Sequence, residues 1–382
     1  MKIFYISESI IPCKAANSIH VMKMCQAFAN NGHETTLFCI NGEEKQSNDY
    51  EYYGVKQNFT INKIQFKKIK ILGLFKFLKK LKYEVKKLKE LPDLLYGRNL
   101  KGLLILSNLN VPIIYESHHP KASRIDCIFE NILFKKSNFF KLVVISEELK
   151  KEYLKRYNFL NSEQIIVAHD GADIPSEVDI INNEKKIESD KKLTVGYIGH
   201  LYPGKGMEII TEVAKKMPDI KFHVVGGTNE WIEYWKEINI DNIEYHGFVN
   251  NGEINLYYNS IDILLLPYKK YVYTYSQKNT KTNSKSTNIA KWISPLKLFE
   301  GMAYKKAMII SDLPTIREVI TNGENALICD SENIEQWVES INLLMNNREF
   351  YTNLSLNAYK TLTEKYTWNI RAKNVIKDLL NE

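Results

Sequence analysis

Short apolar runs alternate with longer amphipathic stretches along the first half of the chain. KIFYIS at residues 2–7 predicts a strand, SIHVMKMCQAFANNG at 18–32 predicts a helix, and HETTLFCI at 33–40 predicts a second strand. Further strands are predicted at DLLYGR, PIIYES, KLVVIS and QIIVAH. Strands that alternate with helices in this way favour a parallel sheet covered by helices on both faces.

The same alternation starts again after a polar segment at about residues 175–192, where we place the domain junction. The second half predicts strands at LTVGYIG, IKFHVVGG, IEYHG, DILLLPY, KAMIIS and ALICD, and YTWNIRAKNVIKDLL predicts a last amphipathic helix. We therefore expect an α/β protein of two facing, Rossmann-like, doubly wound parallel-sheet domains. The expected parts are 1–173 with the C-terminal helix 366–382, a linker at 174–191, and 192–365.

Two such sheets also predict where a ligand binds. Open α/β sheets bind ligands outside the carboxyl ends of their strands, so we expect an active site in a cleft between the two halves. The segment 271–290 is rich in Ser, Thr, Asn and Lys and directly precedes the motif SPLKLFEGMAYKKAMIIS. We interpret it as a loop that borders this cleft.

Composition narrows the class of protein. The chain has 382 residues, of which 44% are hydrophobic and 25% charged, which fits two ordinary domains and excludes global disorder. No apolar run approaches the roughly 18 residues of a membrane span, and the N-terminus opens on a strand rather than a leader, so we expect a cytoplasmic protein. The five cysteines lie far apart, without a C-x-x-C pair and without a nearby histidine spaced for zinc, so neither a disulfide framework nor a metal site is expected.

The motif SPLKLFE predicts a helix start with two charged residues. Ser294 is expected as the N-cap and Pro295 as the first helical residue, so that unpaired N–H groups point outward. Lys297 and Glu300 share one helix face, where the lysine could hold a phosphate and the carboxylate could accept hydrogen bonds from a ribose diol. An ordinary surface ion pair at a capped helix explains the same residues equally well.

A second helix start, in GYIGHLYPGKGMEII, suggests another site for an anion. Gly199, Lys205 and Gly206 lie between a predicted strand and a predicted helix, where Lys205 could meet a phosphate. A plain strand-to-helix turn would use the same residues. Two such helix starts make a diphosphate a better candidate than either start does alone.

Histidines and other polar residues follow several strands of the first half. His118 and His119 end the strand PIIYES, and their position at a strand end makes either a candidate for a working residue or a structural histidine. Arg98 and Asp170 also follow apolar strands, and we interpret both as structural.

Residues 67–90 predict a basic amphipathic helix with ten lysines and two glutamates. Its apolar residues recur at helical spacing, so the helix could dock them on the first core and keep its lysines in water. The alternative is binding to an anionic lipid surface. Scarce arginine and missing interleaved aromatic residues argue against nucleic acid as a partner.

The motifs, in their order and spacing, resemble the retaining glycosyltransferases of family 4, which have the GT-B fold. The resemblance runs from GYIGHLYPGKGMEII through FHVVGG, IEYHGFV and IDILLLPY to SPLKLFEGMAYKKAMIISDLPTIREVITNGENALI and YTWNIRAKNV. It points to the subgroup with an SPxK motif before the ribose-binding glutamate. The implied activity is transfer of a sugar from a nucleotide donor to an acceptor with retention at the anomeric carbon.

The resemblance also implies roles for single residues. Lys205 matches the lysine that binds the donor phosphate, Glu300 the glutamate that holds the ribose, and His118 a histidine beside the transferred sugar. The backbone at Phe248 and Val249 matches the edge that meets the nucleotide base. The implied catalytic residues are His118, Lys205 and Lys297, and the implied donor-binding residues are Gly199, His200, Lys205, Phe248, Val249, Ser294, Pro295, Leu296, Lys297 and Glu300.

Three departures from the family pattern concern the same site. Trp292 stands eight positions before Glu300, where many relatives have a first glutamate. His200 stands where many relatives have arginine. In the loop after the first strand, Ala16, Asn17 and Ser18 stand where relatives usually have a pair of glycines. Together, the three departures concern residues that would contact the donor sugar and its phosphates.

The resemblance implies a reaction in which positive groups steady the departing diphosphate. The sequence contains no D-x-D, so we expect no metal and no cofactor beyond the nucleotide-sugar donor. The expected acceptor is a glycan or a lipid-linked sugar used in cell-surface polysaccharide or glycolipid synthesis, met at the inner face of the plasma membrane if the 67–90 helix binds anionic lipid. The alternatives are a nucleotide-sugar 2-epimerase and a non-catalytic binder of nucleotide sugars or lipids.

Overall fold

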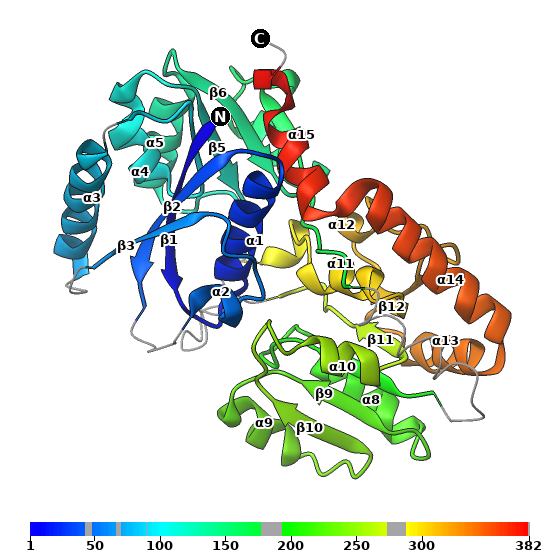
Figure 1. Cartoon of the computed structure of the whole chain (residues 1–382). Coiled ribbons are helices and arrows are strands. Elements are labelled where there is room, and N and C mark those ends of the chain that lie inside the picture. Colours follow the sequence, from blue (N-terminus) through cyan, green and yellow to red (C-terminus); the bar gives the residue numbers. More distant parts are fainter. Residues whose placement is uncertain (43–47, 66–69, 89, 177–192, 273–287, 381–382) are drawn as a thin grey trace. The chain divides into compact units, whose positions relative to one another are not determined.

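The computed structural model describes the chain except residues 43–47, 66–69, 89, 177–192, 273–287 and 381–382 (Figure 1). Internal contacts divide it into a first unit, Met1–His169 with Trp368–Glu382, and a second unit, Asp170–Thr367. Most of the predicted linker 174–191 and of the predicted loop 271–290 lies outside the described residues. At the start of the second unit the Asp170 backbone N–H donates to the Ser294 hydroxyl at 2.8 Å.

The first unit contains a seven-stranded sheet in the order β3-β2-β1-β4-β5-β6-β7, with every neighbouring pair parallel. This order reverses direction between β1 and β4, as in a doubly wound sheet. The strands are β1 (Lys2–Ile11), β2 (Glu34–Asn41), β3 (Thr60–Ile64), β4 (Leu94–Gly97), β5 (Ile113–Ser117), β6 (Phe139–Val144) and β7 (Ile165–Val167).

Helices cover both faces of this sheet because right-handed crossovers on the two sides of the switch point leave on opposite faces. α1 contacts β1, β2 and the C-terminal helix α15, whereas α4 contacts β4, β5, α3 and α5. The helices are α1 (Ala16–Asn30), α2 (Asp49–Tyr52), α3 (Lys70–Lys87), α4 (Leu100–Leu106), α5 (Arg124–Phe134), α6 (Glu147–Arg156) and α15 (Trp368–Leu380).

The second unit repeats the design with a six-stranded parallel sheet in the order β10-β9-β8-β11-β12-β13. Its strands are β8 (Val195–Ile198), β9 (Phe222–Val225), β10 (Ile243–Gly247), β11 (Ile263–Leu266), β12 (Ala307–Ser311) and β13 (Leu327–Cys329). Its helices are α8 (Met207–Lys216), α9 (Asn229–Lys236), α10 (Asn255–Ser260), α11 (Leu296–Ala303), α12 (Pro314–Arg317), α13 (Ile334–Asn346) and α14 (Arg348–Thr361).

Two apolar cores lie on the two faces of this second sheet. One core joins the sheet to α8 and α13, and the other joins it to α10 and α11. The central strands β11 and β12 are buried along their whole length, which explains why DILLLPY and KAMIIS read as continuous apolar runs rather than as alternating ones.

The predicted fold class, two doubly wound parallel-sheet domains, is confirmed. The predicted basic helix at 67–90 is observed as α3, while β3 and the helices between the later strands of the first sheet were not predicted. Among the described residues, no helix combines the length and apolar character that crossing a bilayer requires.

Candidate functional site

The loop after β8 lies at the switch point of the second sheet. β8 pairs with both β9 and β11, and the loop leads from its carboxyl end into α8. Gly206 has φ +113°, and a Cβ there would lie 2.4 Å from the Pro267 carbonyl oxygen. Gly204 has φ +84°, and a Cβ there would lie 2.2 Å from the Tyr271 carbonyl oxygen. Only glycine lets the loop lie this close to the segment that follows β11.

Lys205 lies between these two glycines and is the positive group of the loop. Its Nζ lies 5.5 Å from the ring centre of Tyr202 and 5.3 Å from that of Tyr268. Removal from water among these rings lowers the lysine pKa from 10.5 to about 8. The ammonium group is therefore still charged at neutral pH but poorly hydrated. A bound anion would raise the lysine pKa again and so stabilise the charged form.

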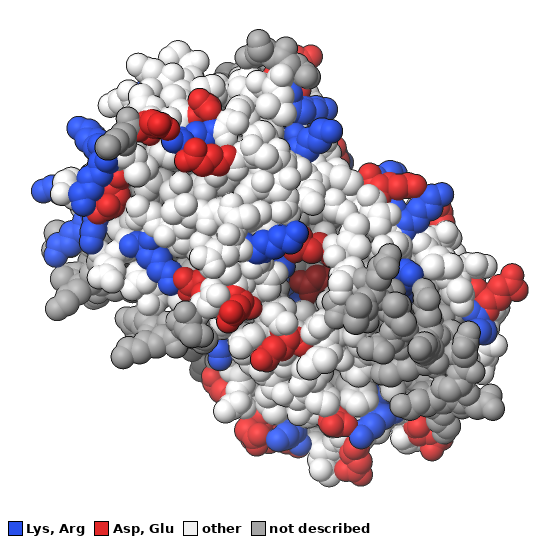
Figure 2. All heavy atoms as spheres, in the orientation of Figure 1, with Lys and Arg blue, Asp and Glu red and all other residues white. Residues whose placement is uncertain are grey.

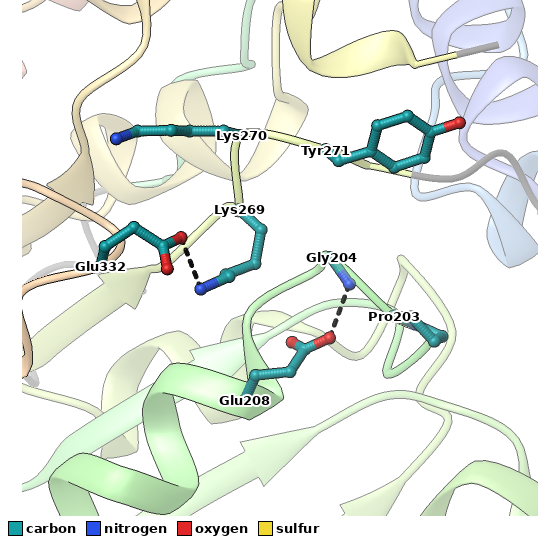
Figure 3. A pocket seen from close by; sticks show the side chains of 7 residues that line it. All are labelled: Pro203, Gly204, Glu208, Lys269, Lys270, Tyr271 and Glu332. Atoms are coloured by element: carbon teal, nitrogen blue, oxygen red, sulfur yellow. Dashed lines mark hydrogen bonds and ion pairs between the residues drawn. The ribbon is translucent and has the colours of Figure 1, made fainter. Parts of the chain in front are cut away.

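Glu208 already occupies two of the backbone donors at the start of α8. Its carboxylate accepts from the Gly204 N–H at 2.8 Å and from the Gly206 N–H at 3.3 Å. Figure 3 shows this carboxylate facing an open depression of about 310 Å³, across from the Lys269–Glu332 ion pair at 2.7 Å. These two N–H groups are thus committed to the protein's own carboxylate, which leaves Lys205 as the phosphate-binding candidate of the loop.

The start of α11 differs from the prediction at its first residues. The prediction of Ser294 as N-cap is wrong, because the helix begins at Leu296 and Pro295 occupies the N-cap position without a side-chain capping bond. The Ser294 hydroxyl instead accepts the Asp170 backbone N–H, and Ser294 is buried. This serine anchors the first residues of the second unit to the segment that precedes α11.

Lys297 and Glu300 form the expected pair one turn into this helix. The Lys297 Nζ lies 2.6 Å from Glu300 Oε2, which also accepts the Tyr258 hydroxyl at 2.6 Å. The side chains of the pair are only 20% and 15% exposed, so this is not an ordinary surface ion pair. Tyr258 is fully buried and stacks on Tyr304 with ring centres 4.5 Å apart, which fixes the hydroxyl that orients Glu300.

His200 lies within electrostatic reach of both lysines. Burial, together with the charges of Lys205 and Lys297, lowers the pKa of this histidine to about 4. The imidazole is therefore neutral at pH 7, so it does not replace the positive charge of the arginine that many relatives carry there. Lys205 and Lys297 supply the positive charge around it instead.

Gly199 and the predicted base-binding residues lie at neighbouring strand ends. The Gly199 N–H donates to the Val225 carbonyl at 2.9 Å at the end of β9. Phe248 follows β10 and is 37% exposed, while Val249 packs against the core on the α11 face. The structure thus places Gly199, His200, Lys205 and the 248–249 segment along the carboxyl edge of one sheet.

His118 lies in the first unit, directly after β5. Its Nε2 is 2.6 Å from Glu116 Oε1, the same oxygen that lies 2.7 Å from His20 Nε2 and 2.9 Å from Arg371 Nη2. Because Nε2 faces a carboxylate, it carries the proton, and Nδ1 is left as an acceptor. Burial lowers the pKa of His118 to about 3, with a further contribution from Arg98, so the ring is neutral at pH 7.

Glu116 is the centre of this network. It is fully buried, and Tyr96 donates to its second carboxylate oxygen. Burial alone would raise its pKa, but Arg371 and His20 outweigh burial and hold the pKa well below the usual range. Reading the sequence missed Glu116, His20 and Arg371, because no local pattern links residues that far apart.

Two further departures from the family pattern occupy ordinary positions. Ser18 donates to the Ala15 carbonyl at 2.7 Å and so closes the first turn of α1, which begins at Ala16. Trp292 follows a short 3₁₀ turn, Ile289–Lys291, just before the SPLK segment.

Comparison with known proteins agrees with this architecture. The family model described as "Glycosyl transferases group 1" matches residues 179–361, and the one described as "Glycosyl transferase 4-like" matches residues 10–120. An uncharacterized glycosyltransferase of Haemophilus influenzae is 25% identical over 353 residues, covering 87% of this chain and 88% of its own. Over these two stretches the chain is thus similar to glycosyltransferases of the group 1 and 4-like families.

Solved structures place its fold among GT-B glycosyltransferases. HepE of Anabaena, solved in complex with UDP and glucose, has a TM-score of 0.69 at 14% identity over 100% of both chains. WaaG, described as a glycosyltransferase involved in lipopolysaccharide biosynthesis, has a TM-score of 0.65 at 12% identity, covering 98% of this chain and 99% of its own. Likenesses at this identity establish the GT-B fold.

Proposed function

We propose that the protein transfers a sugar, with retention of anomeric configuration, from a nucleotide-diphosphate donor to a glycan or lipid-linked acceptor. The proposal is carried by two helix starts of the second unit, where Lys205 lies between two glycines required by the turn into α8 and Lys297 pairs with the half-buried Glu300 on α11, both close enough to His200 to lower its pKa. Two ammonium groups from two different elements suit the two phosphates of a diphosphate, even though Lys297 also pairs with Glu300 at 2.6 Å.

The proposed chemistry stabilises the leaving group. As the bond from the anomeric carbon to the diphosphate breaks, negative charge gathers on the β-phosphate, and Lys205 and Lys297 face that charge in a partly dehydrated site. Glu300 would hold the ribose hydroxyls through the carboxylate oxygen that Lys297 and Tyr258 do not use. The acceptor hydroxyl would attack from the face that the diphosphate leaves, with that diphosphate as proton acceptor.

The remaining predicted residues complete this proposal. The SPLK segment, Ser294 to Lys297, would line the donor site, as in the subgroup with the SPxK motif, and the backbone at 248–249 would meet the base. His118 would contact the transferred sugar through its neutral Nδ1, an acceptor for a sugar hydroxyl. No step of the proposed reaction requires a metal.

The relatives suggest the donor and the pathway. HepE was solved with UDP and glucose, so a UDP-hexose is the first donor to test. WaaG is described as acting in lipopolysaccharide biosynthesis, and we propose a role in cell-surface polysaccharide or glycolipid synthesis for this protein too.

The test starts from a thermal-shift panel of nucleotide sugars, because a ligand that binds the folded state raises the melting temperature. With the best donor, transfer to an acceptor extract is measured for Lys205→Ala and Glu300→Ala against the control Lys215→Ala, whose lysine is 49% exposed on α8. Both site variants should lose donor binding and transfer, and the control should keep them. Parent-like behaviour of both site variants would refute the site.

Three further readouts separate the finer claims. NMR of the product reports whether the anomeric configuration is retained. Full activity in EDTA supports the metal-independent reaction, and loss of activity that Mg²⁺ restores contradicts it. Conversion of the donor alone, without an acceptor, would indicate an epimerase instead.

The membrane part of the proposal depends on α3 and α5. Phe77, Leu81 and Val85 of α3 are buried in the first unit, so this apolar stripe is not available for insertion into lipid. In Figure 2 the lysines of α3 appear as blue side chains clustered over this helix. Figure 1 shows α5 on the same side of the sheet, and its Ile125 and Ile128 are 62% and 57% exposed. We propose that the lysines attract anionic lipid and that these isoleucines enter the interface.

Liposome sedimentation tests this surface. The double variant Ile125→Ser and Ile128→Ser should pellet less than the parent with vesicles that contain phosphatidylglycerol, while Ile238→Ser, an exposed residue after α9, should pellet like the parent. Parent protein that stays in the supernatant with anionic vesicles would leave α3 a structural helix only.

A further inference from the structure

Two histidines and a glutamate meet on the edge of the second sheet. His223 lies on β9, and Glu244 and His246 lie on the edge strand β10. The strands are parallel, with Glu244 paired directly to His223. Glu244 and His246 are two residues apart on one strand, so their side chains leave the same face of the sheet.

The donor atoms of these side chains form a small triangle. His223 Nδ1 lies 3.0 Å from His246 Nε2. Glu244 Oε2 lies 3.8 Å from His223 Nδ1, and Glu244 Oε1 lies 3.8 Å from His246 Nε2. Metal–ligand bonds of about 2.1 Å place neighbouring ligands about 3.0 Å apart in an octahedron and about 3.4 Å apart in a tetrahedron. The observed separations bracket these values, so small side-chain rotations would bring the two ring nitrogens and one carboxylate oxygen onto one ion.

We propose that His223, Glu244 and His246 form a binding site for a divalent transition-metal ion of the zinc class. Two imidazoles and one carboxylate are the ligand set that such ions prefer over Mg²⁺ and Ca²⁺, which favour oxygen ligands. Glu244 is 42% exposed, so the remaining coordination positions face water. The proposal does not depend on the transferase site, since none of the three residues belongs to it.

Two competing interactions must give way. The Lys221 Nζ lies 2.7 Å from Glu244 Oε2, but the lysine side chain is 65% exposed and can swing into solvent. An exposed ion pair of this kind contributes little, so a metal ion would displace it readily. The hydrogen bond between the two rings would also be replaced by two metal–nitrogen bonds.

A second group of the same composition shows what excludes a metal. His20, Glu116 and His118 also bring three ligand atoms together in the first unit. There, Arg371 Nη2 lies 2.9 Å from the shared Glu116 oxygen, and both side chains are almost fully buried. A guanidinium that cannot leave already supplies the positive charge, so a second cation would be repelled.

The ion would link the edge strand β10 to β9. Within the described part of the chain β10 pairs with β9 alone, and residues 248–249 directly follow its end. A bound ion would thus hold β10 in register and limit motion of the segment that follows.

The test uses the full-length protein without a polyhistidine tag, freed of metal with EDTA and dialysed. Titration with Zn²⁺ by calorimetry should show one site, and Zn²⁺ should raise the melting temperature while Mg²⁺ should not. His223→Ala and His246→Ala should each lose at least tenfold in Zn²⁺ affinity. His33→Ala, at a half-buried histidine elsewhere in the first unit, should bind as the parent does.

A variant predicted to bind Zn²⁺ more tightly separates the proposal from the loss of affinity that a misfolded variant would also show. Lys221→Ala removes the ammonium that competes for Glu244, so it should bind Zn²⁺ about two- to fivefold more tightly. The proposal is overturned if the parent binds no Zn²⁺, if His118→Ala or His33→Ala abolishes binding while His223→Ala and His246→Ala keep it, or if Lys221→Ala weakens it.

Discussion

Lys205 should limit stability while it supports donor binding, and Lys205→Met separates the two effects. Burial among Tyr202 and Tyr268 lowers the lysine pKa from 10.5 to about 8. Such a lowering corresponds to about 3 kcal/mol of unfavourable free energy in the charged, folded state. Because the residue is still partly exposed, we expect the methionine variant to gain roughly 1–3 kcal/mol in the free energy of unfolding at pH 7.

The pH dependence gives this prediction its sign. Below pH 8 the lysine is protonated in both the folded and the unfolded chain, so the cost is fully present. Between pH 8 and 10.5 the unfolded chain holds the proton that the folded chain has released, so the parent gains stability relative to the variant and the difference shrinks. Urea unfolding at pH 7 and at pH 10 measures this directly, with Lys215→Met as the exposed control.

The same variant should lose the function that the buried charge serves. Without the ammonium group, the affinity for UDP should fall about 10²-fold, because one charge-assisted contact is removed. The parent should itself bind UDP more weakly as the pH rises through about 8. A Lys205→Met variant that is less stable than the parent at pH 7 would refute the idea that dehydration of the charge lowers the pKa.

Four further outcomes follow from the described contacts. Gly206→Ala forces a Cβ to within 2.4 Å of the Pro267 carbonyl and should cost about 2 kcal/mol or more of stability and weaken UDP binding, whereas Gly323→Ala, with φ +77° and open space around it, should cost about 1 kcal/mol and leave binding unchanged; urea unfolding and calorimetry measure both. Tyr258→Phe frees one bond to Glu300 and should weaken binding of UDP more than binding of inorganic pyrophosphate, since only the ribose contact is affected; equal losses for both ligands would contradict the assignment. Glu116→Gln leaves a buried arginine without its counter-charge and should cost about 3–5 kcal/mol in urea unfolding, and a cost near zero would show that the network does not hold the first unit together. His118→Ala should reduce sugar transfer at pH 5.5 and pH 7.5 by the same factor, because a pKa of about 3 keeps the ring neutral at both; a loss that changes with pH over this range would show that the ring titrates there.

Much of the fold could be predicted because its signals are local. Buried parallel strands read as short apolar runs, and glycines at positive φ mark the turn into α8, so both sheets and the loop at 199–206 were predicted from neighbouring residues. Short strands such as β3 escaped prediction, because TINKI is mostly half-buried and lacks a continuous apolar run.

The candidate site was predicted only in part. Lys297 and Glu300 are three residues apart, so their pairing follows from helix geometry alone. The partner of the Ser294 hydroxyl could not be predicted, because Asp170 lies 124 residues away in the sequence. Ser294 was therefore predicted to cap α11 instead.

Near-neighbour effects alone, hydrophobic periodicity and turn chemistry, set the two doubly wound sheets and the residue types at each strand end. Which of those residues meet depends on the folded chain, since their partners lie far away in the sequence. Glu116 faces Arg371, 255 residues further on, and His223 faces Glu244 and His246 across two strands. Burial then sets their chemistry, since removal from water shifts each pKa by an amount that depends on every neighbour, near or distant in the chain.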